Sequence, residues 1–133
     1  QMPSITNALG LVKFMFPNQY SIYLHDTPSK PLFDLEVRAF SHGCIRLQKP
    51  FEFAYELLKP QTSDPRAQFQ EAMETGEETV VYLRSPVPIH LIYRTAFVDE
   101  LGLINYRRDI YGRDAAIYDA LIAAGIKATP LSG

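Results

Sequence analysis

The chain has 133 residues, a length that suits one domain with its own hydrophobic core. Its hydrophobic content of 47% and charged content of 21% are ordinary for a globular protein. The net charge of −2 argues against the basic surface that nucleic acids require, and no apolar run approaches the ~20 residues of a membrane-spanning helix. We therefore expect no nucleic-acid partner and no membrane span in this chain.

The first predicted elements are two strands. Residues 11–16 alternate loosely between apolar and polar side chains, and residues 21–25 form a second run of this kind. Pro17 and Asn18 between them predict a turn, so the pair is interpreted as a hairpin. On the second strand Tyr23 and His25 share one face, and His25 stands where the chain enters a loop.

That loop extends from residue 26 to about residue 40. Pro28 and Pro31 argue against regular structure in its first half, and a short helix is expected over residues 32–37. The segment Ser41-His42-Gly43-Cys44 follows, and it holds the only cysteine of the chain. A single cysteine cannot form an internal disulfide, so cysteine usage does not identify the compartment.

The second half of the chain contains helices and further strands. The predicted elements are helices at 50–60 and 66–74, strands at 78–83, 89–98 and 103–108, and a helix at 115–124. Pro50 suits a first helical turn, the Asp64-Pro65 pair indicates an N-cap and first residue, and Asp114 is the expected cap of the last helix. Because hairpins outnumber βαβ crossovers, we predict an α+β fold with a mainly antiparallel or mixed sheet.

Cys44 is the best candidate for a chemical role. A thiol with a pKa of about 8.5 is mostly protonated at neutral pH, and a nearby imidazolium or helix N-terminus makes it a nucleophile. His42 and His25 are both candidate bases, and the helix expected at residue 50 is a further means of activation. Gly43 allows close backbone approach, so its amide and that of Cys44 could form an oxyanion hole. Arg46 could bind a substrate carboxylate.

Two other interpretations of these residues stay open. A lone cysteine is often only a small buried apolar side chain, although the polar neighbours of Cys44 weaken that view. Cys44, His42 and His25 could also supply three zinc ligands, but a His-Gly-Cys sequence lacks the usual ligand spacing. We therefore expect neither a metal nor another cofactor.

The spacing from His25 to Ser41-His42-Gly43-Cys44-Ile45-Arg46 resembles the signature of the L,D-transpeptidase catalytic domain, also called the YkuD-type domain. That signature is a His, a loop of about fifteen residues, then Ser/Thr-His-Gly-Cys, an apolar residue and Asn or Arg. Three segments are similar to the larger periplasmic enzymes of Gram-negative bacteria, and the resemblance covers about residues 7–125. These segments are residues 23–28, 40–47 and 111–114.

The resemblance implies a YkuD-like β-sandwich with two or three flanking helices, and roles for the residues of the motif. Cys44 would be the nucleophile and His25 its general base, with the backbone carbonyl of Asp26 orienting the imidazole. His42 would line the site and shape the oxyanion hole with the amides of Gly43 and Cys44. Sequence adjacency instead favours His42 as the base, since residues two apart on an extended chain, such as His42 and Cys44, face the same side. We follow the resemblance and expect His25 to be the base.

The resemblance also implies a substrate. Arg46, Ser41 and Tyr23 would contact a peptidoglycan stem peptide. Cys44 would attack the carbonyl of its third residue, release the terminal D-Ala and form a thioester. An amine of a neighbouring stem, a lipoprotein lysine or water would then resolve the thioester. Carbapenems would acylate the same thiol. The parent protein would be exported to the periplasm, although no signal peptide is visible in residues 1–10.

By this resemblance, residues 1–133 are expected to form a single catalytic domain that lacks its N-terminal strands. A cut sheet edge would leave unpaired backbone groups, a setting for a homodimer or strand exchange. Two further hypotheses stand beside the transpeptidase. One is a non-catalytic cell-wall-binding fragment of the same fold, and the other is a cysteine hydrolase or carboxypeptidase.

Overall fold

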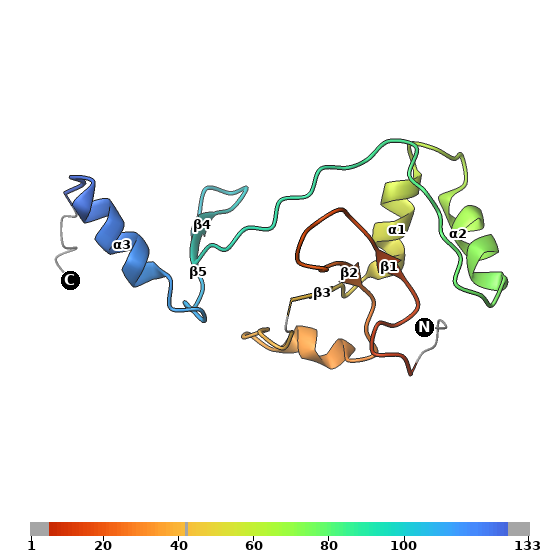
Figure 1. The fold of residues 1–133 in the computed structure, drawn as a ribbon, viewed down its shortest axis with the longest axis horizontal. Coiled ribbons are helices and arrows are strands. Elements are labelled where there is room, and N and C mark those ends of the chain that lie inside the picture. The colour runs from red at the N-terminus through yellow and green to blue at the C-terminus, as the bar shows by residue number, and fades with distance from the viewer. Residues whose placement is uncertain (1–5, 42, 128–133) are drawn as a thin grey trace. The chain divides into compact units, whose positions relative to one another are not determined.

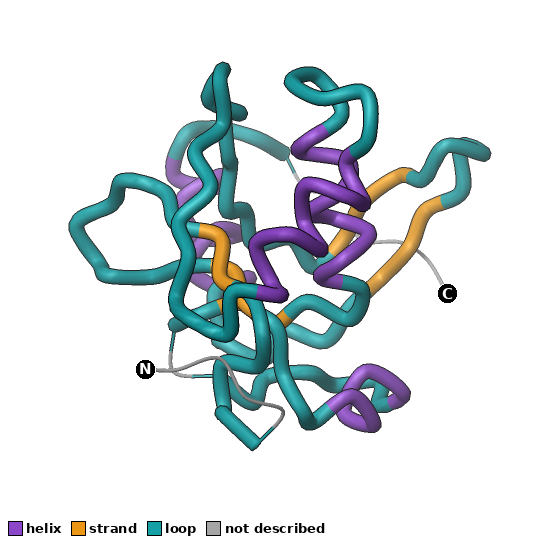
Figure 2. Tube along the Cα trace, turned by 90° about the vertical axis from the view of Figure 1, so that its right-hand side faces the viewer, coloured by secondary structure: helices purple, strands orange, loops and turns teal. Residues whose placement is uncertain are grey.

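The computed structural model describes residues 6–41 and 43–127, and the chain divides into two compact units, Gln1–Pro88 and Ile89–Gly133. The first unit contains β1 (Lys13–Phe14), β2 (Leu24–His25), the 3-10 helix η1 (Lys30–Asp34), β3 (Ile45–Arg46), α1 (Pro50–Leu58) and α2 (Pro65–Glu74) (Figure 1). The second contains β4 (Ala96–Val98), β5 (Ile104–Tyr106) and α3 (Asp114–Ala123). Loops connect these short elements (Figure 2). The mixture of helices and strands confirms the predicted α+β class.

The sheet of the first unit is mixed, as expected, with strand order β1-β2-β3. Strand β2 pairs antiparallel with β1, with Lys13 opposite His25, and parallel with β3, with His25 opposite Arg46. The predicted hairpin is present but short, because pairing stops at Phe14 and Leu24 and leaves residues 15–23 as a long loop. His25 therefore lies on the central strand, paired on both sides.

The connection between the two parallel strands contains η1 (orange in Figure 1), which begins earlier than the helix expected at residues 32–37. Pro31 lies in its first turn rather than preventing it. The expectation was wrong at this point because a first-turn residue needs no backbone N–H and proline already has a helical φ. The amide of Leu35 closes the end of η1 on the carbonyl of Leu32, at 3.4 Å.

Helices α1 and α2 confirm the predicted helices and pack against each other. Aromatic side chains form their contact, with Phe69 of α2 at 5.2 Å from Phe51 and 5.5 Å from Tyr55 between ring centroids. Asp64 caps α2 as predicted, because its Oδ1 accepts from the amide of Ala67 at 2.9 Å. Helices α1 and α2 therefore form one packed pair.

The apolar core of the first unit joins α1 to the sheet. Ala54 and Leu58 occupy one stripe of α1 and are buried, as is Leu24 on β2. Phe14 of β1 meets Phe53 of α1 edge-on, with ring centroids 4.9 Å apart. The sheet is therefore held from one side by α1.

The strand expected at residues 78–83 is absent from the structure, and that expected at 89–98 is reduced to Ala96–Val98. An extended, β-branched sequence becomes a strand only when it pairs with a neighbouring strand. Within the described ranges, residues 78–83 belong to neither sheet. Side chains hold this segment instead. Lys13 pairs with Glu78 at 2.9 Å, and Gln61 Oε1 accepts from the amide of Arg84 at 2.9 Å.

The second unit consists of the β4–β5 hairpin followed by α3. The last predicted strand is confirmed over Ile104–Tyr106. Asp114 is the first residue of α3 and not its cap, and its carboxylate accepts from the Thr95 hydroxyl at 2.9 Å. Gly125 ends the helix as expected, with φ of +85° and hydrogen bonds from its own amide and that of Ile126 to the last turn.

None of the helices in the described ranges is both long enough and apolar enough to cross a lipid bilayer.

Candidate active site

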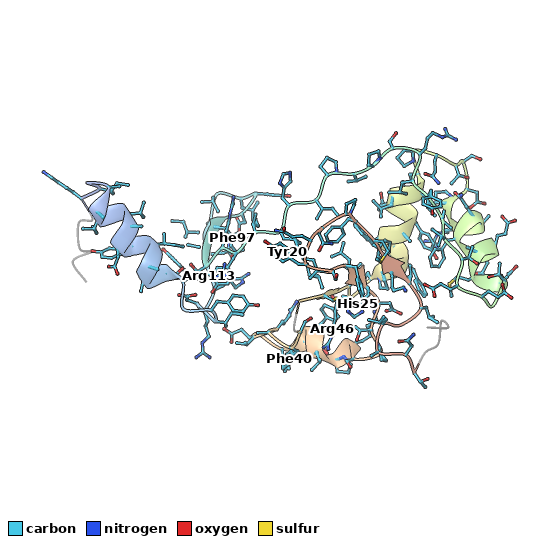
Figure 3. The ribbon with its side chains drawn as sticks, viewed as in Figure 1. Tyr20, His25, Phe40, Arg46, Phe97 and Arg113 are labelled. Carbon is cyan, nitrogen blue, oxygen red and sulfur yellow. The ribbon has the colours of Figure 1, made fainter. Side chains whose placement is uncertain are left out.

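The parallel pairing of β2 and β3 places four of the predicted site residues on one face of the sheet. His25 lies opposite Arg46, and the amide of Ile45 donates to the carbonyl of Tyr23 at 3.0 Å, which continues the ladder to Cys44. Side chains opposite each other in a ladder share a face, as do residues two apart on a strand. Tyr23 lies directly before β2 and Cys44 directly before β3. By this alternation Tyr23 and His25 share their face with Cys44 and Arg46 (Figure 3 labels His25 and Arg46).

The phenol of Tyr23 interacts electrostatically with Cys44. Burial raises the pKa of Tyr23 above its ordinary value of 10.0, and the hydrogen bond and negative charge of Cys44 raise it further against an opposing effect of Lys13. The phenol therefore keeps its proton and can donate it to the sulfur. Cys44 itself is a free cysteine, and it is half-buried.

His25 is held in one tautomer by the backbone. The imidazole is 4% exposed, and its Nδ1 forms a very short hydrogen bond with the carbonyl oxygen of Asp26. A carbonyl oxygen can only accept, so Nδ1 carries the proton and Nε2 of the neutral ring keeps a lone pair. The ring also meets that of Tyr23 edge-on, with centroids 5.9 Å apart. This arrangement leaves Nε2 able to accept a proton.

A side-chain network fixes the Asp26 carbonyl that orients His25. The carboxylate of Asp26 accepts from Lys30 Nζ at 2.7 Å and from the amide of Leu11 at 3.0 Å. Lys30 Nζ also donates to the carbonyls of Leu47 and Gln48, both at 3.0 Å. Lys30 thus ties the end of β2 to the chain leaving β3, the two strands that carry His25 and Cys44.

The sequence analysis missed Lys30 and gave Asp26 only a backbone role. A charged pair at spacing i, i+4 was visible, but the prolines around it indicated an irregular loop, where this spacing predicts no contact.

Replacing Asp26 by asparagine should lower the free energy of unfolding by about 1–3 kcal/mol at pH 7, because a buried acceptor of charged and backbone donors is lost. Burial alone raises the pKa of Asp26, but hydrogen bonds from Lys30, Leu11 and Thr27 outweigh it and leave that pKa below its ordinary 3.8. The stabilisation is therefore complete above about pH 4 and is lost as pH falls through the lower folded-state pKa.

Urea unfolding at pH 7 and pH 3 measures this effect, and the difference between parent and variant should shrink at pH 3. Glu56→Gln is the matched control, because Glu56 forms an exposed ion pair with Lys59 and should change stability little at either pH. A difference between parent and the Asp26 variant that stayed constant with pH would contradict the ionic account.

A pocket of about 230 Å³ opens beside Cys44. Its lining is drawn from two segments, Tyr20, Ser21 and Ile22 before β2, and Ser41, Gly43 and Cys44 before β3. The Ser41 hydroxyl donates to the carbonyl of Cys44 at 2.5 Å and accepts from the amide of Gly43 at 3.3 Å. Ser41 therefore shapes the backbone around the thiol.

The Cys44 amide points away from the sheet. The amides of Ile45 and Leu47 donate to the carbonyls of Tyr23 and His25. Because alternate amides of a strand point to opposite sides, those of Cys44 and Arg46 face the open edge of β3. The extended segment Ile45–Arg46 separates Cys44 from α1, so Cys44 adjoins a strand and not the N-terminus of the helix that was considered as a means of activation. Throughout the described part of the chain, no hydrogen bond or ion pair engages the Arg46 guanidinium.

His42 lies outside the described residues, so its predicted place in the site is not described. Within residues 6–41 and 43–127, no three side chains of His, Cys, Asp or Glu gather closely enough to hold a metal ion.

Replacing Tyr23 by phenylalanine should slow alkylation of Cys44 by iodoacetamide about tenfold near pH 7, because the thiolate loses a hydrogen-bond donor. The two proteins should converge near pH 10, where a free thiol is ionised in any case. Rates from intact mass against pH measure this. Tyr55→Phe, on α1 against Phe69, should follow the parent, and a Tyr23→Phe profile that also did so would remove the hydroxyl from thiolate stabilisation.

Comparison of the sequence with known proteins identifies the family of this chain. The sequence model described as "YkuD: L,D-transpeptidase catalytic domain" matches residues 1–89. A Haemophilus influenzae protein named "Putative L,D-transpeptidase" is 37% identical over 111 residues, which are 84% of this chain. The same stretch is 22% of that protein, so the chain spans about a fifth of the length of the curated relative. This chain belongs to the L,D-transpeptidase catalytic domain family.

Proposed function

We propose that residues 1–133 are a catalytic domain of a peptidoglycan L,D-transpeptidase that works through a thioester on Cys44. The observation that carries the proposal is the shared face of β2 and β3, which brings Tyr23 and His25 together with Cys44 and Arg46. Membership of the family supports the reaction class, and the pocket beside Cys44 provides room for an acyl donor.

The first step of the proposed reaction is acylation of the thiol. His25 Nε2 accepts the proton of the Cys44 thiol, and the sulfur attacks the carbonyl carbon of the third residue of a tetrapeptide stem. The tetrahedral intermediate then breaks its carbon–nitrogen bond to the terminal D-Ala. The imidazolium returns the proton to the departing amine, so free D-Ala leaves and the acyl group remains on sulfur as a thioester.

The second step resolves the thioester. The amine of a neighbouring stem attacks the same carbonyl, and His25 takes a proton from the attacking nitrogen. The carbon–sulfur bond breaks, and the proton returns to the sulfur, which regenerates the thiol. The product is a 3-3 cross-link between two stems, and neither step involves a cofactor.

Donors around the thiol would stabilise the oxyanion of both steps. The outward-facing amide of Cys44 supports this role, whereas that of Gly43 would first have to exchange its 3.3 Å contact with Ser41 for the substrate. We propose His42 as a further contributor. The Arg46 guanidinium, which has no hydrogen bond or ion pair among the described residues, suits a substrate carboxylate. Tyr23 would stabilise the thiolate that forms when His25 takes the thiol proton.

The test is formation of the thioester. The protein is incubated with a tetrapeptide stem, with and without an amine acceptor, and analysed by intact mass and by product chromatography. The expected result is a covalent tripeptide adduct with release of D-Ala, then a cross-linked product when the amine is present. Release of D-Ala without any cross-linked product would indicate a hydrolase or carboxypeptidase, and no adduct would indicate a non-catalytic module.

The family resemblance extends the proposal to inhibitors and location. A carbapenem should acylate Cys44 through its strained amide, which gives a stable adduct for mass analysis. We place the parent enzyme in the periplasm, where its peptidoglycan substrate lies.

A further inference from the structure

The side chain of Asn18 organises the loop that precedes β2. Its Oδ1 accepts from the amides of Tyr20 at 3.0 Å and Ile22 at 3.1 Å. Its Nδ2 donates to the carbonyls of Phe16 at 3.0 Å and Ile22 at 2.7 Å. Both backbone polar groups of Ile22 are therefore bound by one side chain, at a position that the β1–β2 ladder does not reach.

The loop holds one residue in an unfavourable backbone conformation. Ser21 has φ of +53°, and it is the one residue other than glycine with positive φ in the described ranges. A side chain with a Cβ rarely adopts this conformation without support from its surroundings. The hydrogen bonds of Asn18 to the residues on either side of Ser21 supply that support.

This loop is one wall of the pocket beside the thiol. Tyr20, Ser21 and Ile22 face Ser41, Gly43 and Cys44 across it (Figure 3 labels Tyr20). The contact is close, because a Cβ placed on Gly43 would lie 3.2 Å from Cγ2 of Ile22. The position of Ile22 therefore sets the space available next to the nucleophile.

We infer that Asn18 is a positioning residue for the acyl donor, which it serves by holding residues 20–22 as the pocket wall opposite Cys44. The inference rests on the proposed function for the identity of the donor. Asn18 has no part in the proton transfers, so its loss should reduce recognition of a peptide donor and leave the reactivity of the thiol towards small reagents intact.

The experiment compares two reactions of Cys44 in the same variants. Asn18→Ala should slow thioester formation from the tetrapeptide stem about tenfold, because a misplaced wall costs alignment of the donor. Alkylation by iodoacetamide should stay within about twofold of the parent. Asn105→Ala is the matched control, since the Asn105 amide also ties a loop, through Asp99 and Leu103, and should change neither rate.

A second pair of variants separates loop positioning from a general loss of structure. Adding Ser21→Gly to Asn18→Ala should restore much of the lost rate, because glycine adopts positive φ without the Cβ penalty. Adding Ser21→Ala should restore none, although it removes the same hydroxyl. Rescue by both or by neither would overturn the inference.

The remaining outcomes are equally decisive. A parent-like donor rate in Asn18→Ala, or an equal loss in both reactions, would overturn the inference alone. Absence of thioester on the unaltered chain, with normal alkylation, would overturn the proposed function and with it the donor role of Asn18.

Discussion

Replacing Cys44 by serine should abolish thioester formation from a tetrapeptide stem, with a loss of at least about a thousandfold in rate. A serine hydroxyl is a far weaker nucleophile than a thiolate at neutral pH, and the neighbouring groups are arranged around a sulfur. The Ser41 hydroxyl donates to the backbone carbonyl of residue 44, and the substitution does not alter this carbonyl. The local structure should therefore be the same in the variant.

Intact mass after exposure to a carbapenem gives a direct measurement of this effect. Since Cys44 is the only cysteine, the parent should gain one adduct and Cys44→Ser none. The matched control is Ser41→Ala, which removes a hydroxyl from the same segment and should still accept the adduct, at a lower rate. An adduct of equal yield on Cys44→Ser would show that the reagent reacts elsewhere and would remove the nucleophile from the proposal.

Replacing His25 by alanine should reduce acylation by about 10²–10⁴-fold, the usual contribution of a general base. We expect this loss because the hydrogen bond to the Asp26 carbonyl leaves the lone pair of His25 on Nε2, where it can accept the thiol proton. If an imidazole activates the thiol, alkylation of Cys44 in the parent should continue well below pH 8. The His25→Ala profile should then move towards that of a free thiol.

The matched control is His90→Ala, because His90 is an exposed histidine of the second unit. It should leave both the acylation rate and the alkylation profile unchanged. His42→Ala should lower acylation with less effect on the alkylation profile if His42 serves the oxyanion. A shifted profile in His42→Ala and an unchanged one in His25→Ala would exchange the two roles.

Helix positions were predictable because their signals are local. Pro50, Asp64 and Pro65 mark helix starts through φ restriction and a single capping bond, and α1 and α2 begin where these residues predict. The strands were less predictable. Residues 78–83 and 89–95 have strand-like composition, yet pairing depends on partners that composition does not specify.

The residues of the candidate site could be predicted from the sequence, but their arrangement in space could not. Periodicity placed Tyr23 and His25 on one face, and residue chemistry singled out Cys44 and Arg46, which the family motif also contains. The parallel register of β2 and β3, which brings these two pairs of residues onto one face, could be seen only in the structure. Asn18 and Lys30 act through side-chain bonds to backbone groups or to a distant strand, for which the sequence has no periodic signal.

The parallel ladder also makes the His25–Cys44 geometry independent of the part of the connecting chain between η1 and Ser41. Parallel neighbours need a long return path, here residues 26–44, but their alignment is set by backbone hydrogen bonds and by the Lys30 tie. Loop-closure entropy grows only slowly, by about 0.6 kcal/mol for each doubling of length. The return path between η1 and Ser41 is thus free to vary in length and sequence, and with it the surface around the site, while the spacing of base and nucleophile stays the same.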